Sequence, residues 1–217
     1  MSHNLTGAQR RRWRTSVSDL KLSQPDPTTC QAACLAMAVG RDAIWEIRAN
    51  LLGLGTPGDP WTMAKWAECR FPGYEFHPNG SLSNCLEWVR RGDLLITHGW
   101  FTPAGHVIVL DGAEQRAPSA LGRISHAIPW TASPAPADLK WDVCDPWAEF
   151  DGPTWTYQGT ARMFDGFYSS RLIWAGCVAS RSFAQARYLY QKGTPRLDQG
   201  GMWVHRFPSQ AGLAYVI

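Results

Sequence analysis

The spacing of apolar positions predicts that the first ninety residues are mainly helical. Three stretches carry apolar side chains at helical spacing: residues 42–52, 61–70 and 83–91. A fourth stretch, residues 26–39, is rich in Ala, Leu and Met, which favour a helix. Thr28 or Thr29 can cap its start, and Gly40 is a typical helix stop.

The pattern changes after this helical part. Residues 93–98 and 106–110 are short aliphatic and β-branched runs separated by a turn with Gly and Pro, which predicts adjacent antiparallel strands. A segment rich in Ala, Pro and Ser, about 113–138, is expected to be an inserted loop. The later elements are a strand at 141–144, a helix at 182–191 and strands at 203–207 and 213–217. A helical half packed on an antiparallel sheet is an α+β fold.

Charge divides the chain into two expected parts. Residues 1–22 form a basic N-terminal arm whose four arginines account for the net charge of +3, and residues 23–217 form a single, nearly neutral domain. The arm is expected to be flexible and solvated. Its only aromatic residue is Trp13, so it lacks the stacking surface of a nucleic-acid binder, and a protein assembly partner is its alternative use.

Composition excludes several classes. Apolar residues make up 45% and charged residues 18%, which excludes a disordered chain. No apolar run has the length of a membrane span, and the first residues lack a secretory signal, so synthesis in the cytoplasm without a membrane span is expected. The six cysteines are too few for a disulfide scaffold, and Cys30, Cys34, His98 and His106 do not have a zinc spacing. No metal and no cofactor are expected.

Cys30 is the first candidate for chemistry, because it stands at the predicted start of a helix. Unpaired backbone amides and the helix dipole stabilise a thiolate there. Cys34, one turn later among small apolar residues, is expected to be a packing residue. Gln24 lies shortly before Cys30, so that its amide and the Cys30 backbone N–H could together bind an oxyanion.

A thiol nucleophile also needs a base, and His106 begins an apolar strand directly after a turn. Asp145 ends another strand before a proline, which holds its backbone extended and could direct the carboxylate at the imidazole. Asp111 and Asp142 are the alternative carboxylates for this role.

Three segments in this order, Q-P-D-P-T-T-C-Q-A-A-C-L-A-M, G-H-V-I-V-L-D-G and V-C-D-P-W, carry a family resemblance. Together they resemble the papain-like cysteine peptidases of the bacteriocin-processing, double-glycine leader peptidase type. The resemblance implies a papain-like fold, with Cys30 as nucleophile, His106 as base, Asp145 as the orienting carboxylate and Gln24 as oxyanion donor. Gln31 stands where such peptidases commonly have Gly, and its side chain could crowd the cleft.

Three functions remain open at this stage. The first is cleavage of a peptide or isopeptide bond, with Trp100 and Trp147 expected to flank the cleft and clamp an extended substrate. The second is cleavage of peptidoglycan cross-link peptides by a lysin or a virion-associated protein, which reaches the cell wall without a signal peptide. The third is a catalytically degenerate domain that serves as an assembly or binding module, a use that Gln31, the basic arm and the twelve tryptophans would suit.

Overall fold

The computed structural model describes residues 10–14, 19–116, 139–159 and 162–209. The helices are α1 (Cys30–Val39), α2 (Ile44–Leu54), α3 (Pro60–Glu68), α4 (Leu82–Arg90), α5 (Ser170–Gly176) and α6 (Phe183–Lys192). The strands are β1 (Arg10–Arg14), β2 (Glu75–Gly80), β3 (Leu94–Gly99), β4 (His106–Arg116), β5 (Leu139–Asp145), β6 (Glu149–Asp151), β7 (Thr156–Gln158), β8 (Phe164–Ser169) and β9 (Met202–Phe207).

Seven of the strands form an antiparallel sheet whose order in space differs from the order in the sequence, and with the helices this confirms the predicted α+β class. Its order is β2-β9-β3-β4-β5-β8, with β1 paired to the far half of β4, while β6 and β7 form a separate hairpin. β3 and β4 are antiparallel neighbours, as predicted, with Gly99 opposite His106. β9 lies between β2 and β3, although it is the last described strand in the sequence.

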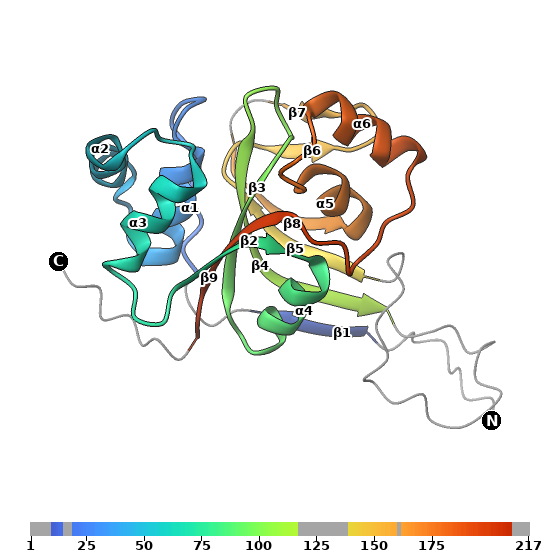
Figure 1. The fold of residues 1–217 in the computed structure, drawn as a ribbon, viewed down its shortest axis with the longest axis horizontal. Helices are drawn as coiled ribbons and strands as arrows, with labels where there is room; N and C mark the ends of the chain where they lie inside the picture. Colours follow the sequence, from blue (N-terminus) through green and yellow to red (C-terminus); the bar gives the residue numbers. More distant parts are fainter. Residues whose placement is uncertain (1–9, 15–18, 117–138, 160–161, 210–217) are drawn as a thin grey trace, which may run out of the picture.

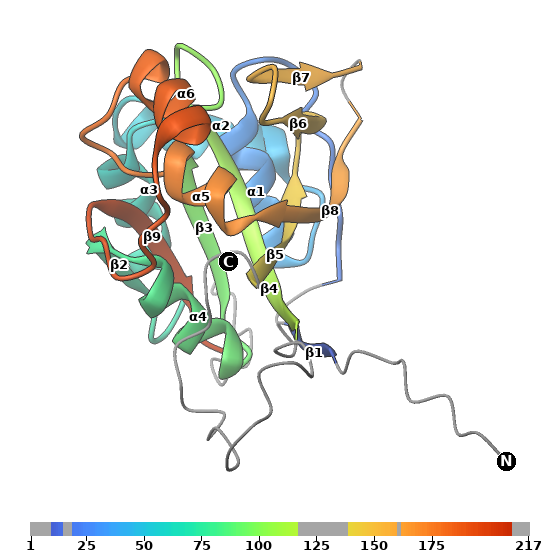
Figure 2. The same cartoon turned by 90° about the vertical axis from the view of Figure 1, so that its right-hand side faces the viewer.

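The sheet separates two hydrophobic cores. Helices α1, α2 and α3 cover one face and share a core with alternate residues of β3 and β4, such as Ile96 and Val109. Helices α4, α5 and α6 pack on the other face, where Leu95 and Ile108 point. Figure 1 shows the two helical layers on opposite sides of the strands, and Figure 2 looks onto the sheet, with α5 and α6 in front of the strands. The predicted helical half is therefore mostly one layer of a three-layer arrangement.

The start of α1 is set by the loop before it. Thr29 is the N-cap residue, but its side chain makes no capping hydrogen bond, and its hydroxyl donates instead to the Asp26 carbonyl at 3.0 Å. The first amides of α1 are thus left uncapped by a side chain. Gly40 ends the helix in the left-handed conformation, with φ of 74°, which glycine adopts without strain.

The basic arm differs from the expectation. Arg10–Arg14 form β1, paired antiparallel with Gly112–Arg116 of β4, so the prediction of a flexible arm is wrong for these residues. The reason is that β4 is longer than β3 and extends beyond it, which leaves an unpaired edge that an extended segment can complete. Residues 1–9 and 15–18 lie outside the described residues.

The predicted inserted loop starts later than expected, because β4 continues through Ala113 to Arg116. The rest of that loop, residues 117–138, and the predicted strand at 213–217 lie outside the described residues. The expected late helix is present as α6, and Ser182 and Gln185 form its capping box. Among the helices of the described residues, none is long and apolar enough to cross a membrane.

Candidate active site

The structure brings Cys30 and His106 together where α1 packs against β4 of the sheet. Cys30 is the first residue of α1 and is partly exposed, while His106 is the first residue of β4 and is buried. Both residues line one pocket, where the thiol and the imidazole interact and shift each other's pKa. Nε2 of His106 bonds to Asp145, so Nδ1 is the ring nitrogen left for the thiol.

Electrostatics in this pair favour the charged forms of both groups. Burial opposes the thiolate, but the hydrogen bond and charge of His106, with the backbone N–H groups of Val107 and Gln31, lower the pKa of Cys30 below its ordinary value. Burial likewise opposes the imidazolium, but the charge and hydrogen bond of Asp145 raise the pKa of His106 to about 10. A thiolate and an imidazolium in contact are the ground state of an activated cysteine nucleophile.

Asp145 holds the imidazole from the side away from the thiol. Its Oδ1 accepts from His106 Nε2 at 2.9 Å and from the Trp147 backbone N–H at 3.0 Å. Its Oδ2 accepts from the hydroxyls of Tyr157 and Tyr168, both at 3.1 Å. The carboxylate has 0% exposure, and these four donors take the place of water around it. A carboxylate fixed in this way fixes the orientation of the ring that it binds.

The alternative carboxylates do not occupy this position. The ring of His106 bonds to Asp145 at the end of β5. Asp111 lies further along β4 and accepts a hydrogen bond from Lys21. Asp142 lies three residues before Asp145 on the same strand, opposite Phe167 of β8.

Gln24 lies near the site, and one N–H of its side-chain amide is held by a neighbouring carbonyl. Its backbone N–H donates to the Pro146 carbonyl at 2.8 Å, which ties it to the segment after Asp145. Its Nε2 donates to the Asp26 carbonyl at 2.7 Å, and its buried Oε1 has no hydrogen-bond partner among the described residues. An amide nitrogen carries two N–H groups, so the bond to Asp26 uses only one of them.

Gln31 does not fill the cleft. Its side chain is buried and turns toward the loop before α3, where Oε1 accepts from the Gly58 backbone N–H at 2.9 Å and Nε2 donates to the Asp59 carbonyl at 3.0 Å. The glutamine therefore fixes a loop that forms one wall of the pocket described next.

A pocket opens beside the Cys30–His106 pair. Its lining consists of Cys30, Gly58, His98, Gly99, Trp100, Ala104, Gly105, His106, Val107, Ala179 and Trp203. Small residues and two tryptophans thus dominate the wall around the reactive pair. Trp100 lies in the pocket wall, as expected, but Trp147 is not among the lining residues that the structure describes and contributes its backbone N–H to Asp145 instead.

A second buried histidine lies on another part of the pocket wall. His98 Nε2 lies 3.2 Å from His205 Nε2, and His205 Nδ1 lies 2.5 Å from the Tyr74 hydroxyl. Burial lowers the pKa of His98 to about 4, helped by the charge of His106 and opposed by the charge of Asp59. Burial and the charge of His98 lower the pKa of His205 well below the ordinary value, so both shifts favour neutral rings, opposite to the shift of His106.

Sequence reasoning missed the tyrosines that hold Asp145 and the residues that β9 contributes. Tyr157 lies on β7 and Tyr168 on β8, two strands that no alternating pattern marks. Trp203 and His205 lie on β9, whose range was predicted without its place beside β3. No local signal in the sequence reports either placement.

One group of described residues has the donor atoms for a metal ion: Asp111, Cys144 and Asp165, whose ligand atoms lie within 4.8 Å of one another. Asp111 lies on β4, Cys144 on β5 and Asp165 on β8, and none of the three lines the pocket.

Comparisons with protein-family models, curated proteins and solved structures found no match to this chain. The geometry of the site alone must therefore carry a functional argument.

Proposed function

We propose that this protein is a cysteine-dependent peptidase or amide hydrolase that acts through Cys30, His106 and Asp145. The single observation that carries the proposal is the buried imidazole of His106, which bonds to Asp145 at 2.9 Å and shares one pocket with the Cys30 thiol, whose pKa it lowers. A structural cysteine needs neither a histidine partner nor a lowered pKa. The resemblance to papain-like peptidases implies the same roles for the same residues.

The chemistry follows from the charges. The Cys30 thiolate attacks the carbonyl carbon, and the carbonyl oxygen becomes an oxyanion next to the uncapped N-terminal amides of α1. The His106 imidazolium gives its proton to the leaving amine. The neutral ring then takes a proton from water while the water oxygen attacks the thioester. The acid product leaves, and the Cys30 thiolate is restored. Asp145 keeps the ring in place through both steps.

The pocket supports an extended peptide as the substrate. Gly58 and Gly105 leave open space in the pocket wall, and the rings of Trp100 and Trp203 offer flat apolar surfaces. Small residues next to the scissile bond fit such a wall. A leader peptide and a peptidoglycan cross-link peptide both satisfy this description. Cleavage assays with each substrate distinguish the two.

Alkylation with iodoacetamide at about pH 6 tests the proposal without knowledge of the substrate. Cys30 is expected to react at least about tenfold faster than the exposed Cys69, which serves as an internal reference in the same molecule. Cys30→Ala is expected to lose the fast phase and to lose the burst of product from an activated ester.

Peptide mapping decides the outcome. A label on Cys30 supports the activated pair. Equal labelling of Cys30 and Cys69, with no ester burst, would instead identify a degenerate domain that is kept for binding or assembly.

A further inference from the structure

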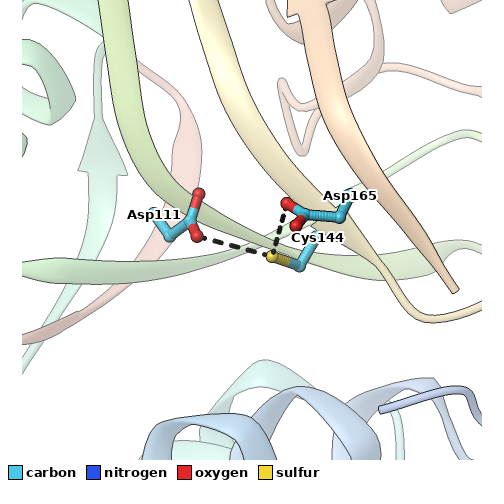
Figure 3. Close-up of side chains that lie close together, drawn as sticks. All are labelled: Asp111, Cys144 and Asp165. Atoms are coloured by element: carbon cyan, nitrogen blue, oxygen red, sulfur yellow. Dashed lines mark hydrogen bonds between the residues drawn. The ribbon is translucent and has the colours of Figure 1, made fainter. Parts of the chain in front are cut away.

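A second reactive cluster lies on the sheet beneath the segment that leads to Gln24. Figure 3 shows three of its members, with the Cys144 thiol between Asp111 and Asp165. Cys144 Sγ lies 3.5 Å from Asp111 Oδ2 and 3.8 Å from Asp165 Oδ1. The fourth member is Lys21, whose Nζ bonds to Asp111 and lies 2.6 Å from Cys144 Sγ and 3.9 Å from Asp165 Oδ1.

This arrangement disfavours a metal ion as the occupant. Two carboxylates and a sulfur are suitable ligands, but the ammonium of Lys21 already lies among them. A divalent cation would have to displace that ammonium from its ion pair with Asp111, whose side chain is only 6% exposed. The lysine is therefore the cation of this cluster.

The contact between the amine and the thiol is the unusual feature. The distance of 2.6 Å from Nζ to Sγ is shorter than an ordinary N–H···O hydrogen bond, although sulfur is a larger acceptor than oxygen. The nitrogen and the sulfur are already held side by side, and a pair held in contact gains a large effective concentration. Lys21 is partly exposed, so a small oxidant has access to the cluster from its side.

We propose that peroxide joins Lys21 and Cys144 through an oxygen-bridged nitrogen–oxygen–sulfur bond. In the first step, the Cys144 sulfur attacks hydrogen peroxide, an S–O bond forms, the O–O bond breaks and water leaves, which gives a sulfenic acid. In the second step, the Lys21 ammonium releases one proton to water, and the resulting amine nitrogen forms an N–O bond with the sulfenic oxygen. The two hydrogens that they lose reduce a second peroxide to two waters. One amine, one thiol and two peroxides thus yield the link and three waters.

The place of the link suggests what it does. Lys21 lies three residues before Gln24, and Cys144 directly precedes Asp145. The hydrogen bond from the Gln24 backbone to the Pro146 carbonyl already joins these two segments. The link would make that contact covalent and would stabilise the folded protein by closing a long loop of chain. This inference does not rest on the proposed peptidase activity.

The test uses the full chain with Cys30→Ala, so that a reactive nucleophile does not consume the oxidant and the result is independent of catalysis. Burial and the charge of Asp111 raise the pKa of the Cys144 thiol, so the protein is held in millimolar peroxide for hours at about pH 9. Mass spectrometry after proteolysis is expected to find the Lys21 and Cys144 peptides joined. Their mass is the sum of the two, with one oxygen gained and two hydrogens lost.

Dithiothreitol is expected to reverse the link, and the linked protein is expected to melt roughly 10 °C higher than the reduced protein. The matched control is Lys21→Arg, which keeps the cation beside Asp111 and cannot form the link. Cys144→Ser is the second control.

Four results would overturn the proposal. They are a Cys144 sulfinic acid with a free Lys21, a disulfide from Cys144, a direct nitrogen–sulfur bond without oxygen, and an unmodified Cys144 after the exposed Cys69 is fully oxidised. A joined peptide in Lys21→Arg would overturn it as well.

Discussion

His106 and His98 lie on neighbouring strands, line the same pocket and are both buried, yet their charges differ. The pKa of His106 is raised to about 10 because its ring lies between Asp145 and the Cys30 thiol. The pKa of His98 is lowered to about 4 because burial outweighs the charge of Asp59, and its Nε2 is hydrogen bonded to another imidazole and not to a carboxylate. Burial acts on both rings in the same direction.

The partner therefore decides the state of a buried histidine. A carboxylate with its own hydrogen bonds satisfied, such as Asp145, stabilises an imidazolium by more than burial destabilises it. A second imidazole gives no such compensation. The two buried rings of one pocket are therefore shifted toward opposite charge states by their different partners.

The largest expected effect comes from removal of the charged ring. His106→Ala is expected to lower the hydrolysis of an activated ester at least about 10⁴-fold and to slow the alkylation of Cys30, since the thiolate loses its counter-charge. His205→Asn serves as the matched control, because it alters the neutral pair behind the pocket wall. Unchanged turnover in His106→Ala would reject His106 as the base.

The next effect concerns the oxyanion. Gln24→Ala is expected to lower kcat by roughly 10²–10³ with little change in KM, because an oxyanion donor acts mainly in the transition state. Steady-state kinetics measures both constants. In the structure the Gln24 amide donates to Asp26, so a variant with wild-type kcat would mean that the backbone amides of α1 suffice.

The two histidine environments also predict opposite pH dependence of stability. The folded-state pKa values of His98 and His205 are lowered, so their contribution is complete above about pH 6.5 and is lost as the pH falls below that value, toward about 4 for His98. The folded-state pKa of His106 is raised, so its contribution is complete below about pH 6.5 and is lost as the pH rises toward 10.

Urea unfolding at a series of pH values measures this difference. Each buried neutral histidine is expected to add about 1.4 kcal/mol per pH unit to the acid-side slope of the unfolding free energy. His205→Gln should flatten that slope, because it removes one of the two buried neutral rings. An unaltered slope in His205→Gln would show that this ring is already charged in the folded protein.

The smallest effect is expected at the second cysteine of α1. Burial raises the pKa of Cys34 well above its ordinary value, and its thiol donates to the Val107 carbonyl at 3.3 Å. Cys34→Ala is expected to keep most of the turnover and to lose about 1–2 kcal/mol of unfolding free energy, measured by urea denaturation. If iodoacetamide labels Cys34 before Cys30, the site assignment fails.

Local patterns predicted the parts of this fold that local forces decide. The helix-favouring run of Ala, Leu and Met in α1, its stop at the left-handed Gly40 and the β-branched strand that begins at His106 are such parts, whereas the expected threonine cap of α1 is not formed. The capping box of α6 has the same local origin. β2 was missed because it is a short edge strand with Pro78 and no apolar alternation.

The candidate site was only partly predictable for the same reason. Cys30, His106 and Asp145 stand in recognisable local contexts, and the structure places them in contact. The four donors to Asp145 and the neutral ring of His205 depend on strand pairings between distant segments, which no local pattern encodes. The direction of the Gln24 amide depends on the turn at Asp26, and a sequence does not specify it.

The insertion of β9 between β2 and β3 has a consequence for the order in which the protein forms. Strands β2 and β3 emerge from the ribosome long before β9, yet they become joined in one sheet only through it. Trp203 reaches the pocket on that same strand, so a nascent chain with Cys30 and His106 already in contact would still lack part of the pocket wall. Pairings over such long sequence separations form slowly. Synthesis itself would therefore delay a complete substrate pocket until the last described strand is in place.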